Sequence, residues 1–105
     1  MTDKETTDMT ANYLDDPEKV KALKDLKTLS NSNARIIYGS DRTRFYDIVI
    51  VLNEVTRLYT THLVVAIDGT TKSLRKEEAV CPLKATRAIV DKLQKDTSLV
   101  FGEGT

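Results

Sequence analysis

The most extended apolar pattern of this chain lies in its middle, from Asp41 to Thr60. Apolar side chains recur there at three- and four-residue spacing, at Phe45, Ile48, Val49, Leu52, Val55 and Tyr59. This spacing predicts an amphipathic helix. The same stretch also alternates, with Tyr46, Ile48, Ile50 and Leu52 on one side and many β-branched residues, which is typical of a strand over 45–52. We favour the helix because the pattern continues beyond the length of an ordinary strand.

Two more helices are predicted on either side of this segment. Asp16 followed by Pro17 and Glu18 has the chemistry of a helix start. The helix that follows is rich in lysine, and the polar run 30–33 is expected to end it because Ser and Asn side chains compete for backbone hydrogen bonds. Pro82 opens the third helix, which the sequence predicts to end at Asp96-Thr97.

Short apolar runs predict strands over 34–38, 62–67 and 99–101, and a turn signal predicts a fourth, edge strand over 71–74. The run LVVAI within 62–67 is wholly apolar, as in a strand buried on both faces. Asp68-Gly69 is a turn signal that would join this strand to the edge strand 71–74.

Helices that alternate with short strands indicate an α+β (or α/β) fold. We expect a small mixed sheet of about four strands packed against three helices. Residues 1–14 are acidic and lack periodic apolar positions, so we expect a disordered acidic tail there, and a single α+β domain over 15–105. A chain of 105 residues can bury a core without disulfides.

Composition narrows the function classes. The chain is 30% charged and 40% hydrophobic, and no apolar run approaches the roughly 20 residues of a membrane helix. The polar N-terminus resembles no signal peptide, so we expect a cytoplasmic protein without a membrane span. Net charge is zero, but residues 1–16 hold five acids against Lys4 alone, a balance of −4, which leaves +4 on the remainder. Solubility is the simplest reason for such a tail.

Candidate catalytic groups are few. His62 is the only imidazole, and the sequence offers it no evident partner for acid–base or metal chemistry. Cys81 precedes Pro82 at a predicted helix start, where a thiol pKa can be lowered, but a small packed residue is the simpler interpretation. The glycines lack phosphate-loop spacing. We therefore expect no enzyme, no cofactor and no metal site.

Two binding hypotheses follow. As a helix, the central segment would be apolar over most of its circumference, and a second subunit could cover the residues outside its main stripe. This predicts a protein-interaction module, a homodimeric adaptor or regulator, with contacts at Ile50, Val51 and Leu58 outside the stripe and at Tyr59 beside them. The alternative is a nucleic-acid-binding regulator, because basic residues lie near aromatic ones, at Arg42, Arg44, Arg57, Lys72, Arg75 and Lys76.

One family resemblance supports the first hypothesis. The stretch ARIIYGSDRTRFYDIVIVLNEVTRLYTTHLVVAI resembles the C-terminal part of the soluble domain of the ExbD/TolR family, with Asp41, Tyr46 and Leu52-Asn53 at matching places. The stretch VVAIDGTTKSL resembles the strand–turn–strand at the start of that domain. The family's membrane helix has no counterpart among these residues, so a proton channel is not implied. The resemblance implies a dimerising, non-catalytic α/β module.

Overall fold

A computed structural model describes residues 15–102 as five elements in the order helix, strand, strand, strand, helix. Their bounds are α3 (Pro17–Tyr38), β1 (Arg44–Asn53), β2 (Leu58–Ile67), β3 (Thr70–Ala79) and α4 (Pro82–Val100). The expected tail over 1–14 lies outside the described residues, and so do residues 103–105.

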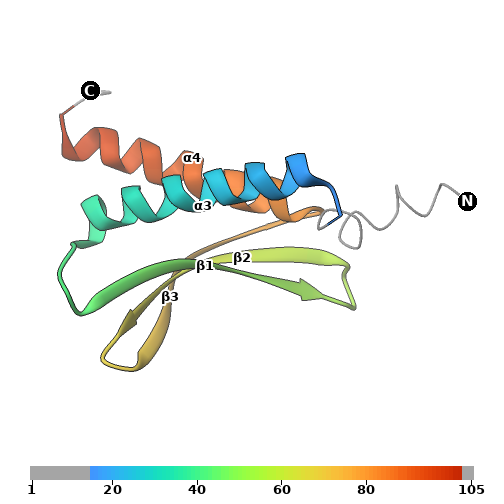
Figure 1. Cartoon of the computed structure of the whole chain (residues 1–105), viewed down its shortest axis with the longest axis horizontal. Helices are drawn as coiled ribbons and strands as arrows, with labels where there is room; N and C mark the ends of the chain where they lie inside the picture. The colour runs from blue at the N-terminus through green and yellow to red at the C-terminus, as the bar shows by residue number, and fades with distance from the viewer. Residues whose placement is uncertain (1–14, 103–105) are drawn as a thin grey trace, which may run out of the picture.

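The strands form an antiparallel sheet in the order β1-β2-β3, and both helices lie on one side of it. Figure 1 shows α3 and α4 side by side and running in the same direction. α3 packs on β1, whereas α4 packs on β2 and β3. The predicted α+β class is confirmed, but the described residues contain three strands and two helices rather than about four and three.

The predicted central helix is wrong, because this segment forms β1, a turn and the start of β2. The structure follows the alternating pattern instead: Tyr46, Ile48 and Ile50 lie on one side of the strand β1 and face the helices. Val55, which extended the helical pattern, lies in the turn with 92% of its surface exposed. That turn forms because the Asn53 carboxamide oxygen accepts hydrogen bonds from the Val55 and Thr56 amides at 3.0 and 3.2 Å.

The predicted strand over 34–38 is also wrong, because α3 continues to Tyr38. The polar run 30–33 stays helical: Asn33 Nδ2 donates to the Leu29 carbonyl (2.7 Å), and Ser30 is buried. Ala34 is fully buried in the core, so packing overrides the local preference of the polar run. The helix ends instead at Gly39, whose φ of 107° disfavours other residues. The Cβ of any other residue at position 39 would stand 2.7 Å from Nη1 of Arg44, so the guanidinium would have to move.

The predicted strand over 99–101 is wrong as well, since Leu99 and Val100 form the last turn of α4. Other local signals are confirmed. Asp16 caps α3 and Pro82 begins α4. Asp68 and Gly69 have φ values of 50° and 82°, the two positive values of a tight hairpin turn between β2 and β3.

The core lies between the helix layer and the sheet. Its buried apolar cluster consists of Ala34, Ile48, Leu63, Ile89 and Leu93. Between the layers, the hydroxyls of Thr61 on β2 and Thr86 on α4 form a buried hydrogen bond of 3.1 Å, which satisfies both groups away from water. None of the helices in residues 15–102 combines the length and apolarity needed to cross a membrane.

An irregularity in the β2–β3 pairing places two consecutive side chains of β3 towards the helices. The register shifts between Leu63 and Val64, with Arg75 opposite Leu63 and Ser73 opposite Val64. Leu74 is the extra residue of this bulge and packs against the core, while Arg75 reaches α3 and α4. The bulge therefore supplies both an apolar contact and an ionic one from the same edge strand.

We predict that Asp16→Ala lowers the free energy of unfolding by about 1 kcal/mol, the usual contribution of a helix N-cap. The Asp16 carboxylate accepts hydrogen bonds from the Glu18 and Lys19 amides at 3.0 and 3.4 Å, and alanine removes both. Denaturant unfolding measures the change. Asp15→Ala is the matched control, because Asp15 carries the same charge one residue outside the cap, and its effect should stay within about 0.5 kcal/mol. Equal losses in the two variants would contradict the capping role.

Candidate functional site

The face of the sheet opposite the helices is left uncovered by the elements of residues 15–102. No helix or strand within residues 15–102 lies over this face, which we call the open face (Figure 1). β1 contributes three apolar side chains to it: Phe45, Val49 and Val51 are 67, 43 and 46% exposed. β2 adds partly buried neighbours on the same face, at Leu58, Thr60, His62, Val64 and Ala66.

β1 has apolar residues on both of its faces, with Asp47 and Asn53 as the polar positions of the open face, and this distinguishes it from an ordinary surface strand. Antiparallel strands with one solvated face usually alternate between apolar and polar residues. In β1, Ile48 and Ile50 face the helices, while Val49 and Val51, which alternate with them, face outwards. Phe45 lies opposite Ala66 on β2, which extends the apolar area across two strands. The composition of β1 is therefore that of a strand covered on both sides.

The open face changes character from β1 to β3. Ser73, Lys76 and Glu78 of β3 lie opposite Val64, His62 and Thr60 of β2. His62 Nδ1 and Ser73 Oγ form a hydrogen bond of 2.9 Å across this strand pair. The face thus has an apolar half along β1 and a polar half along β3.

The free edge of β1 is obstructed near its middle. The Asp47 carboxylate accepts a hydrogen bond from the Ile48 amide (2.8 Å) and pairs with Lys27 of α3 (3.1 Å). An amide that donates to a side chain of its own strand is not available to an added strand. Charged side chains at such a position are a common way to prevent edge-to-edge pairing. The open face, rather than the β1 edge, is therefore the better candidate for an interaction.

The structure separates the four interaction residues that the sequence indicated. Val51 and Leu58 lie on the open face, as diagonal neighbours of adjacent strands. Ile50 and Tyr59 lie on the helix-covered face, where Tyr59 retains only 5% of its exposure. The argument that selected them assumed a helix, so only half of the set shares a surface. Phe45 and Val49 were missed because the helical pattern assigned them to the core. The alternation of apolar residues on both sides of β1 could have identified them.

The six basic candidates do not gather on one surface. Arg42 and Arg44 lie near the start of β1, whereas Arg57 lies in the turn at its far end, with a φ of 62°. Arg44 donates to the Tyr38 carbonyl and pairs with Asp41 (3.6 Å). Lys72 and Lys76 are exposed on β3.

Arg75, the remaining basic candidate, belongs to a cluster that ties the C-terminal ends of both helices to the sheet. Its guanidinium pairs with Asp96 of α4, and its Nε donates to the Tyr38 hydroxyl of α3 (2.7 Å). Burial by itself would lower the pKa of Arg75, but the hydrogen bonds to Asp96 and Tyr38 raise this pKa above its ordinary value. The Tyr46 hydroxyl donates to the Gly39 carbonyl (2.6 Å) at the same end. These contacts give Arg75 a stabilising role in the fold.

His62 and Cys81 lie in different parts of the fold. His62 is on the open face, whereas Cys81 is buried at the start of α4. Within residues 15–102 no three His, Cys, Asp or Glu side chains lie close enough together to hold a metal ion. His62 contacts a hydroxyl, Ser73 Oγ, at a distance usual for a nucleophile and its base, and Cys81 is not part of this pair.

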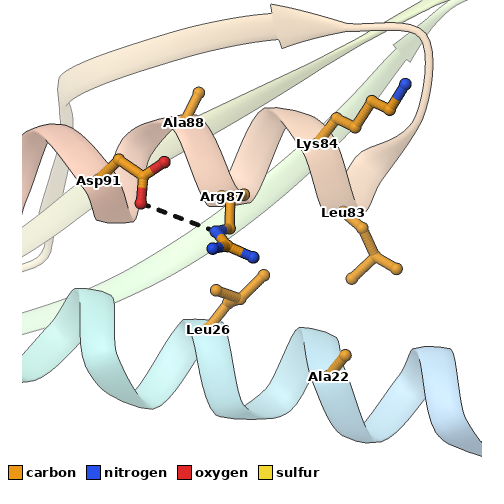
Figure 2. Close-up of a pocket in the computed structure, with 7 residues that line it drawn as sticks. All are labelled: Ala22, Leu26, Leu83, Lys84, Arg87, Ala88 and Asp91. Atoms are coloured by element: carbon orange, nitrogen blue, oxygen red, sulfur yellow. Dashed lines mark ion pairs between the residues drawn. The ribbon is translucent and has the colours of Figure 1, made fainter.

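A second surface feature lies in the helix layer. A groove of about 380 Å³ separates the N-terminal halves of α3 and α4. Figure 2 shows Ala22 and Leu26 of α3 facing Leu83 and Arg87 of α4, with Arg87 paired to Asp91 (3.7 Å). The small side chain of Ala22 and the polar end of Arg87 leave this part of the helix interface unfilled, whereas Val90, further along α4, is buried.

Comparisons with known proteins give no relative from which a function could be carried over. No family model, no curated protein and no solved structure matches the chain. The resemblance to the ExbD/TolR domain stays a prediction that rests on the residues quoted for it.

We predict a pKa for Asp41 below the ordinary aspartate value. The cause is chiefly the hydrogen bond from Thr43 Oγ1 (2.7 Å), then that from the Thr43 amide (2.9 Å), with the Arg44 charge adding to both. Because the folded state lowers this pKa, the stabilisation is present above the unfolded pKa and is lost as pH falls through the folded one. Thr43→Val should therefore raise the Asp41 pKa measured by carboxyl NMR titration. Thr56→Val, in the distant β1–β2 turn, should leave it unchanged, and equal pKa values in all three proteins would contradict this assignment.

Proposed function

We propose that this domain is a non-enzymatic protein-interaction module that forms a homodimer through the open face of its sheet. The observation that carries the proposal is that β1 has apolar residues on both faces while only one is covered. A large apolar patch on a monomer marks an interaction site, because burying it removes apolar surface from water.

The open face has an apolar half along β1 and a polar half along β3, and this arrangement favours a second copy of the chain as the partner. A two-fold axis that lies between the two sheets and runs perpendicular to the strands would set β1 of one copy over β1 of the other. The apolar halves, with Phe45, Val49 and Val51, would then meet each other. The polar halves along β3, with Lys76 and Glu78, would meet at the rim, where charged groups keep their water. Two sheets packed in this way lie about 10 Å apart.

The size of the face sets the expected strength of the dimer. Ten residues of strand across three strands give a flat area of about 500 Å² per copy. A pair would then bury about 1,000 Å², at the lower end of specific interfaces. We therefore expect a concentration-dependent dimer with a dissociation constant of order micromolar or weaker, not an obligate one.

A nucleic-acid partner is the alternative, and this geometry gives it less support. Arg44 and Arg75 are engaged with protein groups, and Arg57 lies at the opposite end of the sheet from Arg42. A gel shift that weakens steeply with salt, and that is lost in Arg42→Ala with Lys72→Ala, would favour this alternative.

We predict that Val49→Lys weakens the dimer by about 100-fold or more. Burying a valine contributes about 1.5 kcal/mol or more, the substitution occurs twice in a symmetric dimer, and each 1.4 kcal/mol is about tenfold. Sedimentation equilibrium from about 10 μM to 1 mM, spanning the affinities expected of such an interface, measures the change.

Val55→Lys is the matched control for this experiment. It makes the same change at an exposed valine of the β1–β2 turn, outside the open face, and should leave the association unchanged. Far-UV circular dichroism of both variants checks that they fold alike. A wild-type chain that stays monomeric throughout, or equal effects of the two substitutions, would overturn the proposal.

A further inference from the structure

The middle of the open face is a row of three residues, one from each strand. Val49 of β1 lies opposite His62 of β2, and His62 lies opposite Lys76 of β3. β1 (Arg44–Asn53) and β2 (Leu58–Ile67) have ten residues each, so Val49 and His62 stand at the centre of their strands. His62 is the only histidine of the chain, and it lies between the apolar half and the polar half of the open face.

The symmetry of the proposed dimer gives this central row a special position. A two-fold axis that lies between the sheets and runs perpendicular to the strands sets each strand over its own copy, in the reverse direction. Full overlap of the two faces buries the most apolar surface, and it places the axis over the middle of the strands. Residues at the centre of a strand then lie over their own copies, and residues at its ends do not.

We propose that the His62 side chains of two copies pair across this axis, so that protonation of the two imidazoles dissociates the dimer. The inference rests on the homodimer proposed above. Side chains from both copies meet between packed sheets, which are about 10 Å apart, and they lose water there. Neutral imidazoles tolerate this position, whereas two imidazolium ions would lose hydration and repel each other.

The charged groups that face His62 supply no counter-ion for its protonated form. On β3, Lys76 lies directly opposite and adds a positive charge, which offsets the negative charge of Glu78, a diagonal neighbour. On β1, the diagonal neighbour is Asp47, whose carboxylate already pairs with Lys27 (3.1 Å). β2 has no other charged residue, and the helices pack on the opposite face. A proton added to each copy therefore stays uncompensated in the dimer.

In a single copy, by contrast, His62 can hold either charge state. Its Nδ1 forms the 2.9 Å hydrogen bond with Ser73 Oγ. A hydroxyl donates to a neutral ring nitrogen and accepts from a protonated one, so this hydrogen bond survives protonation. As pH falls, the monomer therefore binds more protons than the dimer does. The linkage makes association strongest above the range in which histidine titrates, and association is lost as pH falls through that range.

Sedimentation equilibrium at about pH 7.5 and about pH 5.5 measures this effect, because histidine changes charge between these values. An ordinary histidine is about 90% protonated at about pH 5.5, so excluding this form costs up to about tenfold per copy. With two copies per dimer, we expect the dissociation constant to rise by about tenfold or more. His62→Gln, which is neutral at both pH values, should remove this dependence. Ser73→Ala leaves the imidazole in place and should keep it.

Disulfide crosslinking tests the geometry independently of pH. His62→Cys places a thiol near its own copy across the axis, so mild oxidation should give a covalent dimer. Asn53→Cys is the matched control, because it lies on the same face at the end of β1. At about 3.3 Å per residue, the axis leaves residue 53 about 30 Å from its copy, too far for a disulfide. Cys81 is buried and is common to both variants, and far-UV circular dichroism checks that they fold alike.

The outcomes separate this inference from the homodimer itself. A dimer whose dissociation constant is the same at both pH values, or changes equally in His62→Gln, would overturn the pairing of His62 and leave the homodimer in place. Absence of a crosslink in His62→Cys, or equal crosslinking of Asn53→Cys, would place the axis elsewhere and would also overturn it. A wild-type chain that is monomeric at both pH values would overturn the homodimer and, with it, this inference.

Discussion

The contact between the two helices and one face of the sheet is the interaction on which the rest of this domain depends. The buried cluster of the described residues lies in this single layer, between Ala34 of α3, Ile89 and Leu93 of α4, and Leu63 of β2. A domain with two layers leaves the outer face of its sheet and the outer side of its helices in water. Both candidate interaction surfaces are consequences of that arrangement. The open face is the part of the sheet that the helices do not reach, and the groove is the part of the helix pair where small and polar side chains meet.

The two ends of the helix layer are held differently. At the C-terminal ends, the β3 bulge directs Arg75 to Asp96 and Tyr38, so α3, α4 and the sheet share one set of hydrogen bonds. At the N-terminal ends, Ala22 faces Arg87 across the groove, and the ion pairs Lys21–Asp25 and Arg87–Asp91 each lie within one helix. The buried residues of α3 (Ser30, Asn33 and Ala34) all lie in its C-terminal half, so local opening is expected first in the N-terminal half of this helix. A ligand in the groove would therefore stabilise the less constrained end.

The sequence predicted those parts of the fold that local chemistry determines. Asp16 with Pro17, Pro82 and Asp68-Gly69 each specify a start or a turn through their own side chains and dihedral angles. It failed where contacts distant in sequence decide the outcome. The polar run 30–33 remains helical because Ser30 and Ala34 are buried against the rest of the fold. The turn after β1 has no glycine or proline, and it depends on the Asn53 side chain and on a positive φ at Arg57, neither of which the apolar pattern reveals.

The error in the central segment and the candidate function have the same physical origin. A strand with one solvated face would have had polar residues at positions 49 and 51, and its alternation would have been plain. Phe45 and Val49 instead completed a helical spacing with Ile48 and Leu52, so that the segment matched a helix as well. Places where local rules mislead are often places where function has imposed another requirement. Phe45 and Val49, which obscured the strand, therefore lie on the face that the described fold leaves uncovered and that the proposed dimer would cover.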